Sequence, residues 1–264
     1  MLQLPSIDFL TIPVASVTMQ QTIQAIDQCI QNNDHIQHVV INAGKVAAMQ
    51  KDKNLYDSVV NCDLINADGQ SVVWAVRFLG KYLPERVAGI DLMENLVALA
   101  HQKGYKCFFF GAKENVVRRV TAIYAEKYCP EIIAGYRNGY YKQDEEGAIA
   151  RQIGESGANI LFVAISSPQK EVFVNTYKDA LLKVNFTMGV GGSFDVVAGI
   201  IKRAPYWMQN MGLEWFFRLI QEPGRMWRRY LIGNYRFIKL VFKAKFSKND
   251  DETITHFWNP SGSH

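Results

Sequence analysis

The sequence predicts an α/β fold with a Rossmann-like, mostly parallel sheet flanked by helices, followed by a basic and aromatic helical appendage. Over the first two-thirds of the chain, short apolar runs alternate with longer amphipathic stretches, which is the pattern of βαβ units. Gly104 and Gly157 stand where glycines commonly end helices. After Gly199 this alternation stops, and two aromatic stretches replace it.

Apolar runs bounded by turn residues predict strands at 38–42, 63–66, 106–110, 132–135, 159–164 and 186–190. Amphipathic stretches predict helices at 18–31, 46–51, 71–79, 91–103, 114–128, 145–156 and 170–182. Two further helices are predicted at 206–221 and 224–246, separated by Glu222-Pro223-Gly224. We therefore expect an α/β domain over residues 1–205, a helical appendage over 206–248 and a flexible tail over 249–264.

The composition excludes some classes of protein. A content of 48% hydrophobic and 20% charged residues indicates a globular chain rather than a disordered one. The four cysteines form no C-x-x-C pair, which is typical of reduced cytoplasmic thiols. No signal peptide is recognised, and no apolar run approaches the roughly 20 residues that span a bilayer. His35 and His38 have no third ligand nearby in the sequence, so we predict no metal site and expect both in a solvated loop before the strand at 38–42.

Charge is distributed unevenly along the chain. Residues 214–248 contain nine Arg or Lys and two Glu, so they carry +7, while the whole chain carries +4 and the remainder −3. Nine aromatic residues lie in the same segment, which makes a merely solvated basic face a poor explanation. Interleaved basic and aromatic side chains suit an anionic membrane surface. By themselves they suit nucleic acid equally well.

One candidate catalytic residue follows a predicted strand. Asn66-Ala67-Asp68-Gly69 lies between a strand and a helix, and ligands bind at the carboxyl ends of strands in parallel sheets. Asp68 is therefore placed where a general base would be useful. An ordinary helix N-cap is the alternative interpretation of this aspartate.

Three other strand ends carry glycine or polar residues. Gly111 precedes a helix whose N-terminus could bind phosphate, although no G-x-G-x-x-G motif is present and a tight turn explains it equally well. Lys170 follows Ser167-Pro168 and could neutralise a diphosphate, or simply belong to a capped helix start. The glycine turn before Asp195 implies close approach of the backbone to a base, ribose or phosphate, with Asp195 on a ribose hydroxyl or as a helix cap.

Taken together, these blocks resemble the WecG/TagA/CpsF family of bacterial glycosyltransferases, in order and spacing, over roughly residues 5–245. The matching stretches in the α/β part are Asn66-Ala67-Asp68-Gly69, Glu85-Arg86-Val87-Ala88-Gly89, Ser167-Pro168 with Glu171, residues 189–199 and Arg203-Ala204-Pro205. Those in the appendage are Gly212-Leu213-Glu214-Trp215 with Arg218, Glu222-Pro223 with Arg225, and Arg228-Arg229-Tyr230.

The resemblance implies a metal-independent, inverting transferase that moves a sugar from a UDP-sugar to an undecaprenyl-diphosphate-linked acceptor in surface polysaccharide synthesis. Asp68 matches the family's proposed base. The expected donor-binding residues are Asn42, Gly111, Lys170, Gly191, Gly192, Asp195, Arg218, Arg225, Arg228 and Arg229. The expected acceptor-binding residues are Asn66, Arg86 and Gln169.

The resemblance also implies a peripheral protein on the cytoplasmic face of the plasma membrane. No cofactor and no nucleic acid are expected, and homo-oligomer formation stays open. Val40-Ile41-Asn42 and Pro168-Gln169-Lys170-Glu171 depart from the family's usual Thr-Pro-Asn and Pro-Lys-Gln-Glu, which leaves the donor sugar undetermined. Two alternatives are a non-catalytic nucleotide-sugar-binding regulatory protein and an RNA-binding protein; the second leaves the ordered blocks unexplained.

Overall fold

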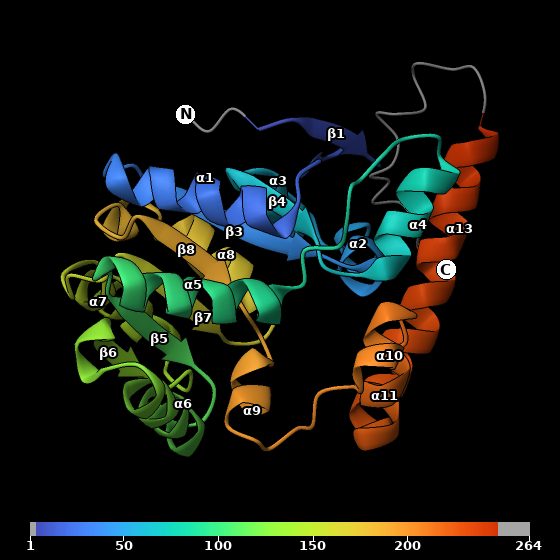
Figure 1. Cartoon of the computed structure of the whole chain (residues 1–264). Helices are drawn as coiled ribbons and strands as arrows, with labels where there is room; N and C mark the ends of the chain where they lie inside the picture. Colours follow the sequence, from blue (N-terminus) through green and yellow to red (C-terminus); the bar gives the residue numbers. More distant parts are fainter. Residues whose placement is uncertain (1–3, 248–264) are drawn as a thin grey trace.

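A six-stranded parallel sheet forms the centre of the molecule (Figure 1). The computed structural model describes residues 4–247, without the side chains of Asn210, Arg225, Arg228 and Arg229. In spatial order the strands are β4 (Leu64–Ala67), β3 (Ile36–Ile41), β8 (Phe186–Gly189), β7 (Ile160–Ala164), β5 (Cys107–Gly111) and β6 (Ile133–Arg137). The predicted α/β fold with a Rossmann-like sheet is confirmed.

Side chains alternate between the two faces of the sheet, so each face has its own apolar core. Phe109 packs with α1 (Met19–Gln31), α5 (Gly89–Lys103) and α6 (Glu114–Lys127) on one face. Its neighbours Phe108 and Phe110 point the other way, toward α7 (Glu146–Gly154) and α8 (Gln169–Thr176). Burial on both faces explains why the central strands read as continuous apolar runs.

The remaining part of that second face is covered by elements near the chain start. α2 (Ala43–Met49), α3 (Lys53–Val60) and α4 (Gln70–Phe78) pack there with a two-stranded antiparallel hairpin, β1 (Ser6–Phe9) and β2 (Ile12–Ala15). The hairpin and α3 were not among the predicted elements. The hairpin turn uses Leu10 and Thr11 at positive φ, so the glycine or asparagine that usually marks such a turn is missing.

The strand predicted from residue 38 is confirmed, whereas the solvated loop also expected for His38 is wrong. His38 lies within β3, only 4% exposed, with its Nε2 3.0 Å from Asn66 Oδ1. Burial lowers the pKa of the His38 imidazole to about 3, so the ring is neutral at physiological pH. Pairing with Asn66 is what makes a polar ring tolerable in the core.

The appendage consists of more, shorter helices than predicted. The stretch 206–221 is divided into α10 (Tyr206–Asn210) and α11 (Glu214–Gln221) by Gly212, whose φ is +68°. The stretch 224–246 contains α12 (Pro223–Trp227), a π-helical turn (Arg228–Ile232) and α13 (Gly233–Phe246). A glycine at positive φ and a π turn each redirect the chain, which helix propensity alone does not show.

One face of α13 is part of the body's core. It runs beside α2 and α4 (Figure 1) and buries Phe237 and Val241, with the Phe237 ring 6.2 Å from that of Phe9. Removing the appendage would therefore expose apolar surface of the α/β domain as well as delete basic residues. The predicted flexible tail, 249–264, falls outside the described residues.

Candidate active site

A cavity of about 250 Å³ opens at the carboxyl ends of β3, β4 and β8. The α/β part contributes Asn42, Asp68, Gly69, Arg86, Gly189, Gly192 and Arg203 to its walls, and the appendage contributes Glu214, Trp215 and Arg218. Ligands of open parallel sheets bind at this end of the strands. The predicted residues Asn42, Asp68, Arg86, Gly192 and Arg218, which are far apart in the sequence, all line this one cavity.

Asp68 follows β4 directly, and its backbone N–H extends the parallel pairing by donating to Ile41 O at 2.9 Å. Its carboxylate Oδ1 accepts a hydrogen bond of 3.0 Å from the Gly89 N–H, at the start of α5. The N-cap of α4 is Gly69, so Asp68 is not the cap of the helix that follows it. Burial raises the pKa of Asp68, while the Gly89 N–H and Arg86 oppose that rise. A carboxylate with a raised pKa is a stronger base.

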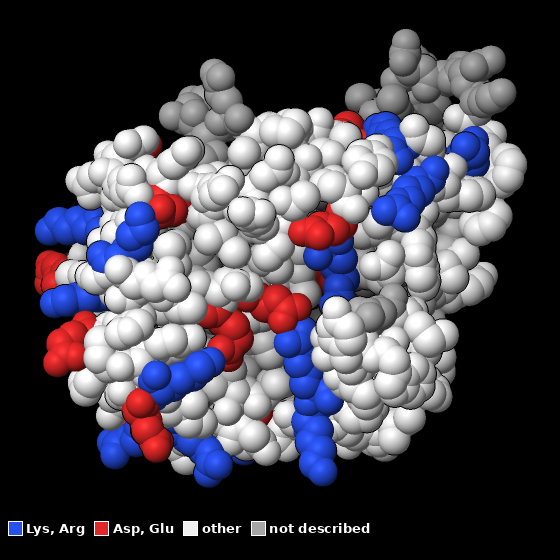
Figure 2. All heavy atoms as spheres, viewed as in Figure 1, with Lys and Arg blue, Asp and Glu red and all other residues white. Residues whose placement is uncertain are grey.

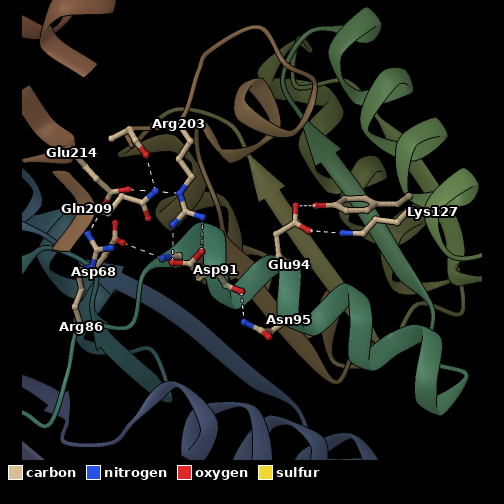
Figure 3. Close-up of polar contacts among 12 residues, drawn as sticks. Asp68, Arg86, Asp91, Glu94, Asn95, Lys127, Arg203, Gln209 and Glu214 are labelled. Carbon is tan, nitrogen blue, oxygen red and sulfur yellow. Dashed lines mark hydrogen bonds and ion pairs between the residues drawn. The ribbon is translucent and has the colours of Figure 1, made fainter. Parts of the chain in front are cut away.

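Four charged side chains meet beside Asp68 (Figure 3). Arg86 Nη1 donates to Glu214 Oε2 at the start of α11, and Arg203 Nε lies 3.8 Å from Glu214 Oε1. Arg203 also forms a two-pronged ion pair with Asp91 in the first turn of α5, with N–O distances of 2.6 and 2.7 Å. The appendage is thus joined to the body next to the candidate base.

The glycine turn after β8 lies against an arginine of the appendage. A Cβ added to Gly192 would come within 2.2 Å of Arg218 Nη2, so only glycine leaves room for the guanidinium. Gly191 has open space around it and needs glycine for its φ of +52° instead. Arg218 also lies 4.0 Å from Glu222, one turn along α11. The turn therefore places a cation at the cavity wall.

Lys170 lies behind the cavity wall and not in it. Its aliphatic stem lies along Gly189, whose added Cβ would meet Lys170 Cε at 3.0 Å. Lys170 Nζ and Lys45 Nζ both contact Glu171 Oε1, at 2.9 and 2.8 Å, and all three side chains are buried. Burial opposes ionisation of Glu171, but the two ammonium groups outweigh it and lower the pKa of Glu171 to about 2. The cluster keeps one excess positive charge beside the end of β8.

Asn66 is fully buried and does not line the cavity. Besides its contact with His38, its Nδ2 donates to Thr22 Oγ1 at 3.4 Å, and this hydroxyl donates to Thr18 O. The polar chain connects β3 and β4 to α1. Its position two residues before Asp68 suits it to hold the end of β4 in place.

The other predicted residues lie elsewhere. Gly111 fits against the Ala164 backbone, 2.5 Å from an added Cβ, so close strand-end packing accounts for it. Gln169 is exposed and donates to the Tyr141 hydroxyl at 3.1 Å. Asp195 lies in the first turn of α9 (Ser193–Val197), and none of these three lines the cavity. The side chains of Arg225, Arg228 and Arg229 fall outside the described part of the structure.

Arg203 and Glu214 are charged residues of the cavity that were not assigned a role from the sequence. Arg203 and Glu214 both belong to blocks that carry the family resemblance, and this was the only signal available for them. Their partners are 112 and 128 positions away in the chain, so no local pattern shows the contact. Within residues 4–247, no group of three or more His, Cys, Asp or Glu is arranged to hold a metal ion.

Comparison with known proteins adds a family and a relative. The sequence model described as the glycosyl transferase WecG/TagA/CpsF family matches residues 7–251. The chain is also 36% identical, over 191 residues, to the N-acetylglucosaminyldiphosphoundecaprenol N-acetyl-beta-D-mannosaminyltransferase of Bacillus subtilis (strain 168). The aligned part is 72% of this chain and 73% of the relative.

Proposed function

Because the chain belongs to the WecG/TagA/CpsF family of glycosyl transferases, we propose that it moves a sugar from a UDP-sugar to a polyprenyl-diphosphate-linked sugar. The printed name of the Bacillus relative describes transfer to such a lipid-linked sugar. The observation that carries the proposal is the position of Asp68, a carboxylate with a raised pKa in a cavity rich in arginine. The polymer that the product enters would be a bacterial surface polysaccharide.

Inverting transfer requires one base. Asp68 would remove the proton from the acceptor hydroxyl while its oxygen bonds to the anomeric carbon of the donor sugar. The bond between that carbon and the phosphate oxygen breaks on the opposite side, and UDP leaves with the electron pair. A single carboxylate suffices, unlike the paired carboxylates of a glycosidase.

The departing diphosphate gains negative charge, which fixed donors can meet without reorganising. Arg218 and Arg203 line the cavity, and a guanidinium offers five N–H donors in a rigid fork. Lys170 would add charge from behind Gly189, while Asn42, Gly191 and Gly192 would border the nucleotide. We propose that Arg225, Arg228 and Arg229 complete this set, in place of a divalent cation. We propose that Gly111 and Asp195 support the ends of the strands with which they are associated, β5 and β8.

The acceptor would approach from the side of Arg86, which lies next to the base. Asn66 would keep the end of β4 in register. Gln169, which donates a hydrogen bond to Tyr141, would bind the acceptor beyond the ends of β7 and β5. None of the described helices is long and apolar enough to cross a membrane. We propose that the lipid-linked acceptor is reached at a membrane surface.

We propose that the appendage and α4 form that membrane-binding surface. Exposed rings run along it: Phe78 lies 5.4 Å from Phe242, which lies 6.0 Å from Phe246, and Lys245 Nζ is 5.4 Å from the centre of Phe78. On the face in Figure 2, Lys and Arg gather over adjoining ends of α4 and α13, while the surface over α10 and α11 shows almost none. Apolar rings bordered by cations suit anionic lipid.

Replacing Phe242 and Phe246 by Ser should weaken cosedimentation with anionic vesicles by about tenfold or more. These rings are 51% and 72% exposed, and inserting about 100 Å² of apolar surface at roughly 25 cal/mol per Å² contributes about 2.5 kcal/mol for each ring. Leu182→Ser is the matched control, since Leu182 is 52% exposed but precedes β8 at the other end of the strand. Equal loss in both variants, or none in either, would contradict the assignment of the surface.

Replacing Gly192 by Ala should weaken UDP binding by about tenfold, because the new methyl group displaces the Arg218 guanidinium. The fold should be retained, since a flexible side chain moves rather than the backbone. Arg218→Ala should give a similar loss, and the double variant should lose little more than either single one. Calorimetric titration with UDP measures all three; additive losses would show that Gly192 does not act through Arg218.

The function itself is tested by screening UDP-sugars for thermal stabilisation, then assaying transfer to a polyprenyl-diphosphate-linked N-acetylglucosamine analogue with and without EDTA. We expect one donor to stabilise the protein, transfer with inverted anomeric configuration, and no effect of EDTA. Stabilisation without transfer would favour a non-catalytic nucleotide-sugar-binding regulator. Activity lost to EDTA and restored by manganese would show that a metal meets the diphosphate charge.

A further inference from the structure

We propose that Glu214 is a positioning residue for the base: it holds Arg86 away from Asp68, so that docking of α11 on the body keeps the Asp68 carboxylate unpaired. The kinetic consequence rests on the proposed function, whereas the link between the two carboxylates rests on the geometry beside the cavity. Neither Glu214 nor Arg203 had been assigned a role by its place in the sequence.

Glu214 binds two arginines of the α/β body at once. Arg86 donates to its Oε2, and Arg203 approaches its Oε1 (Figure 3). The Arg86 side chain is 14% exposed and those of Glu214 and Arg203 are each 30% exposed, so solvent screens these pairs less than pairs on the open surface. Gly212 packs against Gln70 and Trp74 of α4 just before Glu214, which fixes where α11 begins.

The first turn of α5 provides a second connection between the carboxylates of Asp68 and Glu214. Gly89 at its start donates to Asp68, and Asp91, two residues later, forms the two-pronged pair with Arg203. Arg203 in turn faces Glu214. Movement of α11 would therefore change the partners of Arg86 and Arg203 without moving the end of β4.

The balance of charge shows what Glu214 does. Asp68, Asp91 and Glu214 are negative and Arg86 and Arg203 positive, so the group has one carboxylate more than it has guanidinium groups. Asp91 is paired with Arg203, and Glu214 is paired with Arg86. Without Glu214, Arg86 would be free to pair with Asp68, and an ion-paired carboxylate is a weaker base.

The groups that face Asp68 come from five segments. The Gly89 N–H, Arg86 and Lys45 favour the ionised carboxylate, Glu214 disfavours it, and Arg203 senses the charge of Asp68 as well. Among these, Glu214 alone comes from the appendage. Contact between the appendage and the membrane would therefore affect Asp68 through a single side chain, that of Glu214.

The test compares wild type with Glu214→Gln and Glu214→Asp in the full-length protein. The Asp68 carboxyl is titrated by carbon-13 NMR, with the signal assigned by its loss in Asp68→Asn. In Glu214→Gln the pKa of Asp68 should fall by about half a unit or more, because a like charge is removed and Arg86 is released. Glu214→Asp should restore most of the shift. Glu114→Gln, which removes a carboxylate from an exposed pair with Arg118, should leave it unchanged.

Kinetics with a water-soluble acceptor analogue follow the same variants. In Glu214→Gln, kcat should fall about tenfold or more, and the acid limb of the pH profile of kcat should shift to lower pH. The KM for the donor should change by less than about threefold. A folded Glu214→Gln protein with an unchanged or raised Asp68 pKa overturns the proposal and leaves Glu214 as an anchor. If the titration behaves as expected but wild type transfers no sugar, the proposed function fails and the link stands.

Discussion

Replacing Asp68 by Asn should reduce sugar transfer by about 10²–10⁴-fold, the usual contribution of a general base. Asn keeps an oxygen that can accept the Gly89 N–H, so the turn after β4 should hold its shape. Donor affinity should stay within about threefold of wild type, because the nucleotide would bind on the Gly192 and Arg218 side of the cavity. Turnover of saturating donor and acceptor, with donor affinity from calorimetry, measures both effects.

The pH profile provides the control for this assignment. Activity of wild type should fall as the pH drops through the pKa of Asp68, which burial places above its ordinary 3.8. The residual activity of Asp68→Asn should lack that limb, since its side chain does not titrate. Near-wild-type turnover by the variant, or an acid limb that survives in it, would show that another group takes the proton.

Replacing Glu171 by Gln should destabilise the protein by about 3–5 kcal/mol, because it leaves the buried ammonium groups of Lys45 and Lys170 without their carboxylate. Asp57→Asn is a matched control: it breaks an exposed pair with Lys53 one helical turn away, which contributes about 0.3–0.5 kcal/mol. Urea unfolding at neutral pH compares the two. Similar losses in both variants would show that the two buried lysines do not depend on Glu171.

The lowered pKa of Glu171 also makes the stability of the protein depend on pH. The pKa of Glu171 in the folded protein, about 2, lies below the ordinary 4.5, so the folded state binds its proton less tightly than the unfolded state does. The stabilisation is complete above pH 4.5 and is lost as the pH falls toward 2. The difference in stability between wild type and Glu171→Gln should therefore shrink across this window and stay constant above it.

The sequence by itself determined the α/β class and the six strands of the sheet, because fully buried parallel strands read as apolar runs between amphipathic helices. It also singled out Asp68 and Gly192, which line the cavity, because sheets of this class bind ligands at the carboxyl ends of their strands. The N-terminal hairpin escaped it because Leu10 and Thr11 give no turn signal. Helix boundaries in the appendage escaped it because a single glycine and a π turn decide them.

Only the tertiary structure decided which of the strand ends share a cavity. Gly111 and Gln169 follow strands just as Asp68 does, yet the sheet order puts β5 and β7 away from β4, so they lie outside the cavity that Asp68 lines. The contacts of Glu214 with Arg86 and of Arg203 with Asp91 could not be predicted from the sequence, because each joins residues more than a hundred positions apart. Charge, periodicity and turn chemistry are local properties of a chain, whereas the partners of a charged side chain depend on how distant elements pack.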